Sequence, residues 1–534
     1  MISVQNESEL AALAVQIIGG RQFLNSAERA IVSSKRPARI DQLNELREAI
    51  LAGLDPLGVD FIRLRSPKIR RAHGAVYTPG MIVDAMIDWA KVEPGPSPAR
   101  IVDPGSGSGR FLLGAARAFP DAELVGVEID PLALLLLRAN AEVAGFADRL
   151  TLHLGDYRTL KLPPISGRTL FIGNPPYVRH HQISDDAKSW FAETAKQYGF
   201  RASKLAGLHV HFFVRTREIA HAGDFGAFIT SSEWMDVNYG AVLRNMLADG
   251  LGGTALHVLD ATVRPFEEAL TTGAITCFRV GNRPEKFTVR AVRSVDELQP
   301  LAKGKPLSWS TVIATTRWSQ LVGPRKRKPS GVIELGELFR VHRGQVTGSN
   351  AVWIASAQAR DLPKRFLFPA ITRARELFQA QNGILNHVDH LRYVVDLPVD
   401  LDVLTVTERC AVERFLAWAK TKRADQSFVA MHRRAWWSVG LREPPPIFCT
   451  YMARRPPAFV RNDARARYLN IAHGLYPRQP MNDFEMSTIL LYLRETVGMS
   501  GGRTYAGGLV KYEPGEVERL YIPDPVTLLE HLPA

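Results

Sequence analysis

The sequence is poor in cysteine and has no long hydrophobic run. Its 534 residues include three cysteines, Cys277, Cys410 and Cys449, which are far apart and lack paired spacing. This pattern argues against a disulfide framework or a zinc site and fits a reducing cytoplasm. The longest apolar run, Leu132 to Leu137, is far shorter than the roughly 20 residues that span a bilayer. We therefore expect a cytoplasmic protein with no metal and no membrane partner.

The sequence also lacks an excess of acidic residues. It carries 67 Lys and Arg against 54 Asp and Glu, a formal charge of +13, with an isoelectric point near 9.7. Basic side chains that neutralise phosphates supply most non-specific affinity for nucleic acids, so the charge indicates a polyanionic partner. The length allows about three domains at roughly 150–200 residues each.

A loop with two consecutive prolines is the most informative stretch. Asn174-Pro175-Pro176-Tyr177 follows Thr169 to Gly173, an apolar run typical of a buried strand. The prolines fix φ and remove backbone donors, so the loop holds its polar groups in one arrangement. The amide oxygen of Asn174 and the carbonyl of Pro175 can accept both hydrogens of an exocyclic amine, and a base can stack on Tyr177. Taken alone, the loop also fits an ordinary turn that begins at Asn.

A glycine-rich turn precedes this loop in the chain. Residues 100–113 are typical of a strand, a turn with Gly105 and Gly107, and an apolar helix. Such a turn lets backbone approach a ligand closely at a helix N-terminus. Asp103 comes before the glycines and would face a cationic or hydroxyl-bearing ligand rather than a pyrophosphate, so NAD is disfavoured.

Two further strands are predicted to end in acidic residues. The strand at Leu124 to Asp130 carries Glu128, which can accept from both hydroxyls of a ribose. The strand at Leu150 to Leu154 is followed by Asp156, which could accept from an adenine amine. Any one of these acids could be a solvated loop carboxylate or a helix cap. Three of them at βαβ spacing indicate a shared ligand site.

The N-terminal region is predicted to be helical. Amphipathic patterns cover Glu9 to Leu24 and Ile40 to Leu54, with residues 55–58 as the stop of the second helix. We interpret them as a helical cap. Tyr77-Thr78-Pro79 then leads into a helix at Gly80 to Val92, where the Thr78 hydroxyl can cap the helix or contact a ligand.

The alternation of helices and strands continues after the proline loop. Helices are predicted at 208–220 and 239–247, and strands at 225–229, 254–259 and 274–280. This order predicts an α/β fold, a parallel sheet with helices on both faces that finishes with a hairpin at its edge. Ligands in such sheets bind outside the carboxyl ends of the strands, where the singled-out residues fall.

With its motifs in this order, the chain resembles the amino-group DNA methyltransferases, most closely the γ-class adenine-N6 enzymes that use S-adenosylmethionine. The resemblance covers about residues 74 to 280 and implies a Rossmann-like class I methyltransferase sheet. Gly105-Ser106 stands where the family often has Ala-Cys, which keeps the side chains small. The resemblance implies that S-adenosylmethionine is held by Tyr77, Thr78, Pro79, Asp103, Gly105, Gly107, Glu128, Ile129 and Asp156. It implies that a flipped adenine is held by Asn174, Pro175, Pro176 and Tyr177, with Tyr239 as a second aromatic.

The implied function is site-specific methylation of adenine N6 in double-stranded DNA as the modification component of a restriction-modification system. A separate cognate restriction endonuclease would be a partner, and the chain would act as a monomer. Four alternatives stay open: RNA adenine-N6 methylation, DNA cytosine-N4 methylation, protein glutamine methylation, and a catalytically inactive DNA-binding specificity protein.

The C-terminal half differs from the catalytic half in pattern. Residues 411–478 carry 13 Lys and Arg against 4 Asp and Glu, interleaved with aromatic residues, the mixture expected where side chains grip DNA. Val341 to Asn350 and Tyr505 to Pro514 resemble the entry and closing segments of target-recognition domains. We predict a helical segment at 1–70, a catalytic domain at 71–285, a connecting region with a basic linker at 286–330, and a mixed α+β target-recognition domain at 331–534.

Overall fold

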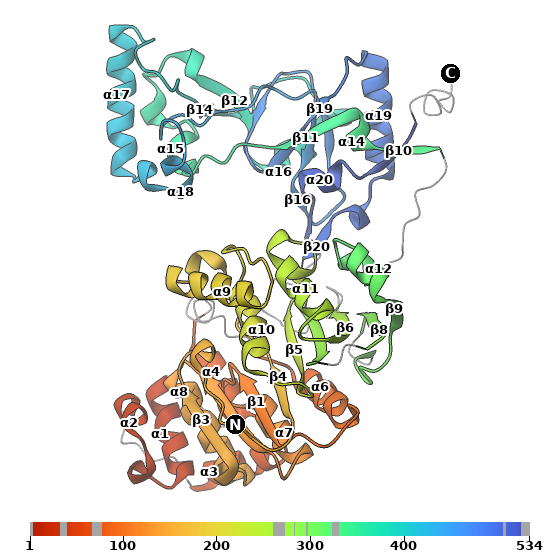
Figure 1. Ribbon diagram of the computed structural model, residues 1–534. Helices are drawn as coiled ribbons and strands as arrows, with labels where there is room; N and C mark the ends of the chain where they lie inside the picture. The colour runs from red at the N-terminus through yellow and green to blue at the C-terminus, as the bar shows by residue number, and fades with distance from the viewer. Residues whose placement is uncertain are drawn as a thin grey trace. The chain divides into compact units, whose positions relative to one another are not determined.

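The structure, a computed structural model, describes residues 4–32, 40–66, 77–259, 273–281, 284–294, 297–322, 331–505 and 509–524. The chain divides into two compact units, Met1–Arg325 (unit 1) and Lys326–Ala534 (unit 2), shown in Figure 1. The three cysteines are free thiols. Across the described residues, every helix is too short or too polar to cross a membrane. Residues 74–76, the basic stretch 324–330 and residues 506–508 lie outside the described residues.

Unit 1 is built on a nine-stranded sheet. Its strands, in spatial order, are β3 (Leu150–Leu154), β2 (Glu123–Glu128), β1 (Arg100–Pro104), β4 (Thr169–Gly173), β5 (Phe225–Ser231), β7 (Gly273–Arg279), β6 (Gly253–Leu259), β8 (Lys286–Val292) and β9 (Lys305–Ser308). The first five run parallel, and β7 runs antiparallel to both β5 and β6. The predicted α/β class is confirmed.

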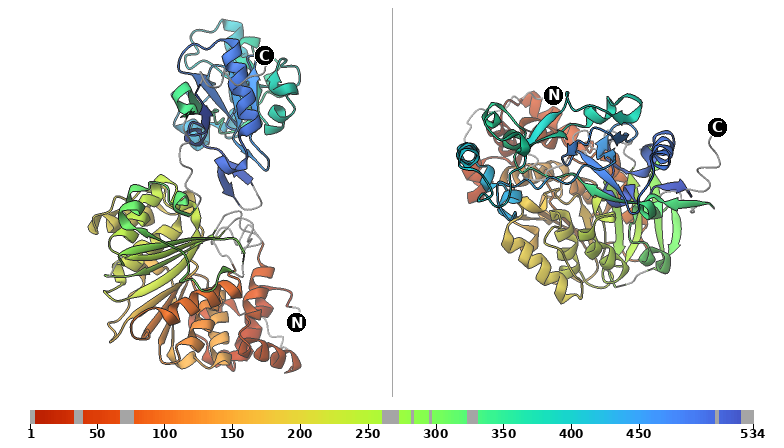
Figure 2. Two further views of the ribbon diagram at one scale, coloured as in Figure 1. Left: turned by 90° about the vertical axis from the view of Figure 1, so that its right-hand side faces the viewer. Right: turned by 90° about the horizontal axis from the view of Figure 1, so that it is seen from above.

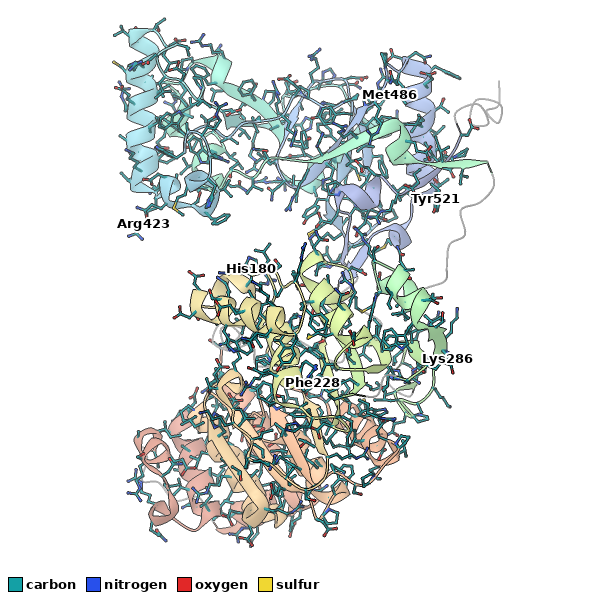
Figure 3. All side chains as sticks on the ribbon, in the orientation of Figure 1. His180, Phe228, Lys286, Arg423, Met486 and Tyr521 are labelled. Atoms are coloured by element: carbon teal, nitrogen blue, oxygen red, sulfur yellow. The ribbon has the colours of Figure 1, made fainter. Side chains whose placement is uncertain are left out.

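Helices cover both faces of this sheet (Figures 1 and 2). Successive residues of a strand point to opposite faces, so Ile101 packs in one hydrophobic cluster and Val102 in the other. The first face is covered by α1 (Glu7–Ile18), α3 (Ile40–Leu51), α4 (Pro56–Leu64), α6 (Gly80–Val92), α7 (Arg110–Ala118) and α8 (Pro131–Ala144), with the short α2 (Ser26–Ile31) beside α8. The second is covered by α9 (Asp185–Gln197), α10 (Leu208–Ile219), α11 (Ala241–Ala248), α12 (Trp309–Ala314) and α13 (Ser319–Val322). Phe228, labelled in Figure 3, is fully buried on this second face.

The end of the sheet differs from the prediction. The hairpin of β6 and β7 is present, but it is not at the edge, because β8 pairs parallel with β6 and β9 pairs antiparallel with β8. The sheet therefore continues past residue 285, where we expected a connecting region to begin. Phe287 and Val289 of β8 are buried, while Lys286, the first residue of this strand, is exposed. This alternation at the start of β8 was the signal that we overlooked when we predicted a connecting region.

The N-terminal helices also have different limits. The first ends at Ile18, earlier than Leu24, because Gly19 adopts a left-handed conformation with φ of 97° and closes the helix. Residues 55–58, interpreted as a helix stop, instead start α4. Asp55 accepts a hydrogen bond from the Gly58 amide at 2.9 Å and Pro56 occupies the first turn, an arrangement that favours a helix start.

The described residues of unit 2 form four small sheets. A five-stranded sheet has the order β11 (Phe339–Arg343), β19 (Ala472–Pro477), β15 (Ile447–Thr450), β17 (Phe459–Asn462) and β13 (Ile384–Leu385). A second sheet has the order β14 (Arg392–Val395), β12 (Leu367–Ile371) and β18 (Arg467–Tyr468). A third has the order β16 (Met452–Ala453), β21 (Leu509–Lys511) and β20 (Arg503–Tyr505). The fourth pairs β10 (Val332–Glu334) with β22 (Tyr521–Pro523). The helices are α14 (Leu335–Leu338), α15 (Asn350–Trp353), α16 (Ala374–Phe378), α17 (Val406–Thr421), α18 (Phe428–Met431), α19 (Asp483–Thr496) and α20 (Pro514–Val517).

Candidate active site

The predicted site residues gather where four parallel strands end. Strands β3, β2, β1 and β4 are neighbours in that order, so their carboxyl ends lie at one edge of the sheet. Asp103 lies near the end of β1, Glu128 ends β2, Asp156 follows β3, and Asn174 follows β4. The fold thus brings together residues that lie about 70 positions apart in the chain.

The glycine-rich turn lies directly against the proline loop. Gly105 and Gly107 have φ of 85° and 53°, in the left-handed region that favours glycine. A Cβ on Gly105 would lie 3.5 Å from Cδ of Pro176, whereas a Cβ on Gly107 would meet no atom within 4 Å. The backbone at Gly107 is therefore open on the side where a side chain would stand, just before the N-terminus of α7.

Glu128 links the second strand to this turn. Its Oε2 accepts from the Gly107 amide at 3.0 Å, and its Oε1 accepts from the amides of Ile129 and Asp130 at 2.8 and 3.0 Å. Burial raises the pKa of Glu128, and these backbone hydrogen bonds act in the opposite direction. The side chain of Ile129 is 54% exposed, so the tip of β2 presents an apolar surface beside a carboxylate.

Asp103 is a buried acid without a protein partner. It is 1% exposed, and neither of its carboxylate oxygens is hydrogen-bonded to any described residue. A Cβ on Gly173 would lie 2.5 Å from Asp103 Oδ1, so glycine at the end of β4 makes room for the carboxyl group. Burial raises the pKa of Asp103 well above its usual range, and the charge of Glu128 adds to this effect. The two oxygens of Asp103 are therefore free to accept hydrogen bonds from a ligand.

A hydrogen bond orients the amide of Asn174. Its Nδ2 donates to the hydroxyl of Thr78 at 3.0 Å, while its Oδ1 has no hydrogen-bond partner within the described ranges. Thr78 is 5% exposed and makes no capping hydrogen bond to α6, whose N-cap is Pro79. The hydroxyl that could have capped the helix instead fixes which way the Asn174 amide points.

The segment around Thr78 is held in place by Arg110, the first residue of α7. Its guanidinium donates to the Thr78 carbonyl and lies 3.8 Å from the ring centre of Tyr77. Burial raises the pKa of Tyr77 to about 12, although the nearby Arg110 charge lowers it in part. The glycine-rich turn and residues 77–79 therefore meet at one side chain.

Asp156 is engaged by a neighbouring arginine that the sequence interpretation overlooked. Both of its oxygens lie 3.0 Å from Nε of Arg158, and its Oδ1 accepts from the Arg158 amide at 2.9 Å. Burial alone raises the pKa of Asp156, but these hydrogen bonds outweigh burial and lower it. A ligand amine at this position would share the carboxylate with Arg158.

The two predicted aromatic residues have different surroundings. Tyr177 lies edge-to-face with His209, with ring centres 6.4 Å apart, and burial raises the pKa of Tyr177. Burial also lowers the pKa of His209 to about 4, so this imidazole is neutral at physiological pH. Tyr239 lies in a short 3₁₀ turn, and its hydroxyl donates to Glu233 at 3.5 Å. Its placement opposite Tyr177 across a base stays a prediction.

Sequence reasoning missed a buried polar cluster beneath the turn. Ser108 donates to Oδ2 of Asp55 at 2.5 Å, and Asn140 donates to Oδ1 of Asp55 at 3.0 Å. Arg110 lies 3.7 Å from the same carboxylate. The available signal was the Asp55-Pro56 pair, which favours a helix start. In the parts of the chain that the structure describes, no group of three or more side chains is arranged to hold a metal ion.

Three stretches of the chain match known protein families. Residues 61–205 match "N-6 DNA Methylase", residues 169–259 match "Eco57I restriction-modification methylase", and residues 309–532 match "Type II methyltransferase M.Eco57I, C-terminal domain". The first match includes both the glycine-rich turn and the proline loop, and the second includes the proline loop.

Similar proteins were found at whole-chain and local scale. The chain is 52% identical to Type II methyltransferase M.XamI of Xanthomonas campestris pv. amaranthicola, covering 98% of this chain and 99% of that protein. It is 36% identical over 121 residues to the tRNA1(Val) (adenine(37)-N6)-methyltransferase of Porphyromonas gingivalis, covering 22% of this chain and 46% of that protein. A cryoEM structure of a DrdV–DNA complex is alike in fold, with a TM-score of 0.52, 13% identity, and coverage of 92% of this chain and 61% of that chain.

Proposed function

The chain belongs to the family of Type II methyltransferases, and from that premise we propose that it methylates N6 of a flipped-out adenine in double-stranded DNA with Asn174 at the reacting amine. It is an adenine-specific DNA methyltransferase of the restriction-modification type. The role of Asn174 rests on the different surroundings of its amide nitrogen and its amide oxygen. Thr78 takes one side of the amide, which leaves Oδ1, a buried acceptor, for an amine hydrogen.

The proposed chemistry is positioning combined with electrostatics. The lone pair of an adenine amine is spread into the ring, which makes the nitrogen a poor nucleophile. When Asn174 Oδ1 and the Pro175 carbonyl accept both amine hydrogens, they favour a more tetrahedral nitrogen and hold its lone pair in one direction. Pro176 keeps the loop stiff, and no strong base is needed for this role.

The cofactor proposed for this site is S-adenosylmethionine, which supplies the methyl group when bound. Its ammonium and hydroxyl groups are donors, and the site offers acceptors that fit them. Asp103 has two buried oxygens without protein partners. Glu128 keeps lone pairs for ribose hydroxyls beside its backbone hydrogen bonds. The exposed side chain of Ile129 suits an adenine ring.

The remaining assigned residues shape the cofactor site. Gly105 and Gly107 allow close backbone approach at the start of α7. Residues 77–79 form the wall that Arg110 holds, and Asp156 would accept from the cofactor's adenine amine while keeping Arg158. Tyr177 and Tyr239 would stack on the flipped base and return part of the unstacking cost, a few kcal/mol.

The experiment that tests the function is expression of the full chain in a methylation-free bacterial host, followed by genome sequencing that detects N6-methyladenine. We expect one short motif to be modified almost everywhere. The Asn174→Ala variant should bind S-adenosylmethionine nearly as well as wild type but leave the genome unmodified. Asn245→Ala, at an exposed position of α11, is the matched control. Wild-type modification levels in Asn174→Ala would contradict the proposed mechanism.

The local match to a tRNA methyltransferase spans only 22% of the chain, so it reports a shared catalytic core. Modified cytosine in the host genome, or modified RNA without modified DNA, would defeat the assignment.

We also propose that the chain acts as a monomer and that a separate restriction endonuclease cuts the same motif when it is unmodified. Sedimentation of the purified chain with and without DNA tests the first point.

A further inference from the structure

Unit 2 contains a basic cavity that none of the roles above uses. It has a volume of about 770 Å³ and is lined by Arg340 and His342 of β11, Tyr476 of β19, Arg442, Glu443 and Arg478. All of these residues belong to unit 2, so the cavity is complete within it. Three guanidinium groups at one hollow indicate an anionic ligand.

The register of two strands builds the hollow. Arg340 and His342 are two positions apart on β11, so their side chains project from the same face. In the pairing of β11 with β19, Arg340 is opposite Tyr476 and His342 is opposite Gly474. A Cβ on Gly474 would lie 2.7 Å from the hydroxyl of Tyr468, so only glycine leaves space for that hydroxyl.

The hydroxyls and the carboxylate of the cavity are already committed to protein partners. Tyr476 donates to the Glu443 carbonyl at 2.5 Å, and Tyr468 donates to the His342 carbonyl at 3.3 Å. The carboxylate of Glu443 lies 3.0 Å from the guanidinium of Arg467. The groups that remain for a ligand are the guanidinium donors, the imidazole of His342 and the neutral amide of Gln479, which also lines the cavity.

The guanidinium groups differ in how they are held. Arg478 donates from Nε to the Gly336 carbonyl at 2.7 Å. Arg340 and Arg442 are exposed, and within the described part of unit 2 their side chains have no hydrogen bond and no ion pair. Burial lowers the pKa of His342, and the charges of Arg442 and Arg340 lower it further. These like charges repel one another, and an anion between them would offset the repulsion.

We infer that this cavity binds a phosphate group of the DNA backbone, an inference that rests on the proposed action of the chain on DNA. Phosphate oxygens are acceptors only, which matches the donors that Arg340 and Arg442 leave unused. A guanine edge also offers two acceptors, but it is neutral, and a single arginine satisfies it. The cavity thus fixes the position of DNA on unit 2 without reading its sequence.

The test uses the full chain with Arg340→Ala and Arg442→Ala. Arg365→Ala is the matched control, because Arg365 is an exposed arginine of unit 2 that lies outside residues 411–478 and outside the cavity lining, and it is ion-paired with Glu408 at 2.8 Å. Dissociation constants are measured over a range of KCl for two short duplexes, one with and one without the motif that wild type methylates. Loss of one phosphate contact should lower the salt slope by about 0.9 and weaken binding about eightfold at 0.1 M salt, equally for both duplexes.

Charge-retaining variants sharpen the test. Arg442→Lys should keep a salt slope close to wild type, because a lysine still neutralises a phosphate, whereas Arg442→Gln should behave as Arg442→Ala. An affinity and slope unchanged in the alanine variants would overturn the inference. A loss confined to the duplex with the methylated motif would overturn it too, because that result would show base reading. A wild-type chain that methylates no DNA would instead overturn the proposed function.

Discussion

The hydroxyl of Ser108, in the glycine-rich turn, donates a 2.5 Å hydrogen bond to Oδ2 of Asp55, the N-cap of α4. Asn140 of α8 completes the connection, because its Nδ2 donates to Oδ1 of Asp55 at 3.0 Å and to the Ser108 carbonyl at 2.9 Å. The N-terminal helices are therefore joined to the turn by buried polar groups as well as by apolar packing. A change in this cluster should reach the site through the shape of the turn.

Ser108→Ala should weaken both folding and cofactor binding. The variant leaves the buried carboxylate of Asp55 with one donor fewer, which costs about 1–3 kcal/mol of unfolding free energy. We expect a lower apparent unfolding temperature and a dissociation constant for S-adenosylmethionine raised several-fold, measured by calorimetry. Ser106→Ala is the control from the same turn, because its hydroxyl makes only a 3.4 Å contact to the Val127 carbonyl. Equal effects of the two variants would show that the link to Asp55 has no special role.

Asp103→Asn should stabilise the cofactor-free protein at neutral and alkaline pH. Burial raises the pKa of Asp103 well above its usual range, so the folded state holds a proton that the unfolded state releases above about pH 4. Wild type therefore loses stability as pH rises from that point toward the raised pKa, and the asparagine variant does not. Apparent unfolding temperatures of the two proteins should coincide near pH 4 and diverge as pH rises.

The same variant should bind S-adenosylmethionine more weakly, because an amide lacks the charge that a carboxylate offers to an ammonium group. Stability and binding would then change in opposite directions at pH 8. A variant that is less stable than wild type at that pH, or that binds the cofactor with unchanged affinity, would show that the buried carboxyl has a different role.

Much of the catalytic core could be predicted because its elements are encoded locally. The limits of β3, β4 and α6 were predicted to the residue, since apolar runs bounded by glycine, proline and acidic residues mark them. The grouping of the strand tips followed from the general rule for parallel sheets. These features depend on sequence neighbours alone.

The parts that were missed depend on contacts between distant residues. The placement of β7 between β5 and β6, and the addition of β8, follow from which strands bury each other's side chains. Asn174, which donates to the hydroxyl of Thr78, lies 96 positions from it in the chain. Ser108 lies 53 positions from its acceptor, Asp55. A single sequence offers no periodic pattern for such pairs.

Thr78→Val should lower the turnover number more than it changes cofactor affinity. Valine keeps the shape of threonine but removes the acceptor of the Asn174 amide, so the amide loses its fixed orientation. A lost hydrogen bond of about 1 kcal/mol corresponds to roughly a fivefold fall in the methyl-transfer rate. Single-turnover kinetics with saturating cofactor measure this rate. Thr78→Ser retains the hydroxyl and should restore most of the rate, and a serine variant as slow as the valine variant would contradict the proposed orientation.

The last prediction is that residues from about 325 onward choose the DNA sequence. All residues assigned to the chemistry lie in unit 1, which has its own two-sided hydrophobic core, whereas the basic and aromatic window at residues 411–478 lies in unit 2. Sequence is read by base-edge contacts from a docked surface rather than by the pocket that holds the adenine. A chain that ends after Arg325 should therefore bind S-adenosylmethionine but no longer methylate one defined motif in the host genome. Calorimetry and genome sequencing measure the two properties separately. Methylation of the wild-type motif by the shortened chain would place sequence recognition in unit 1.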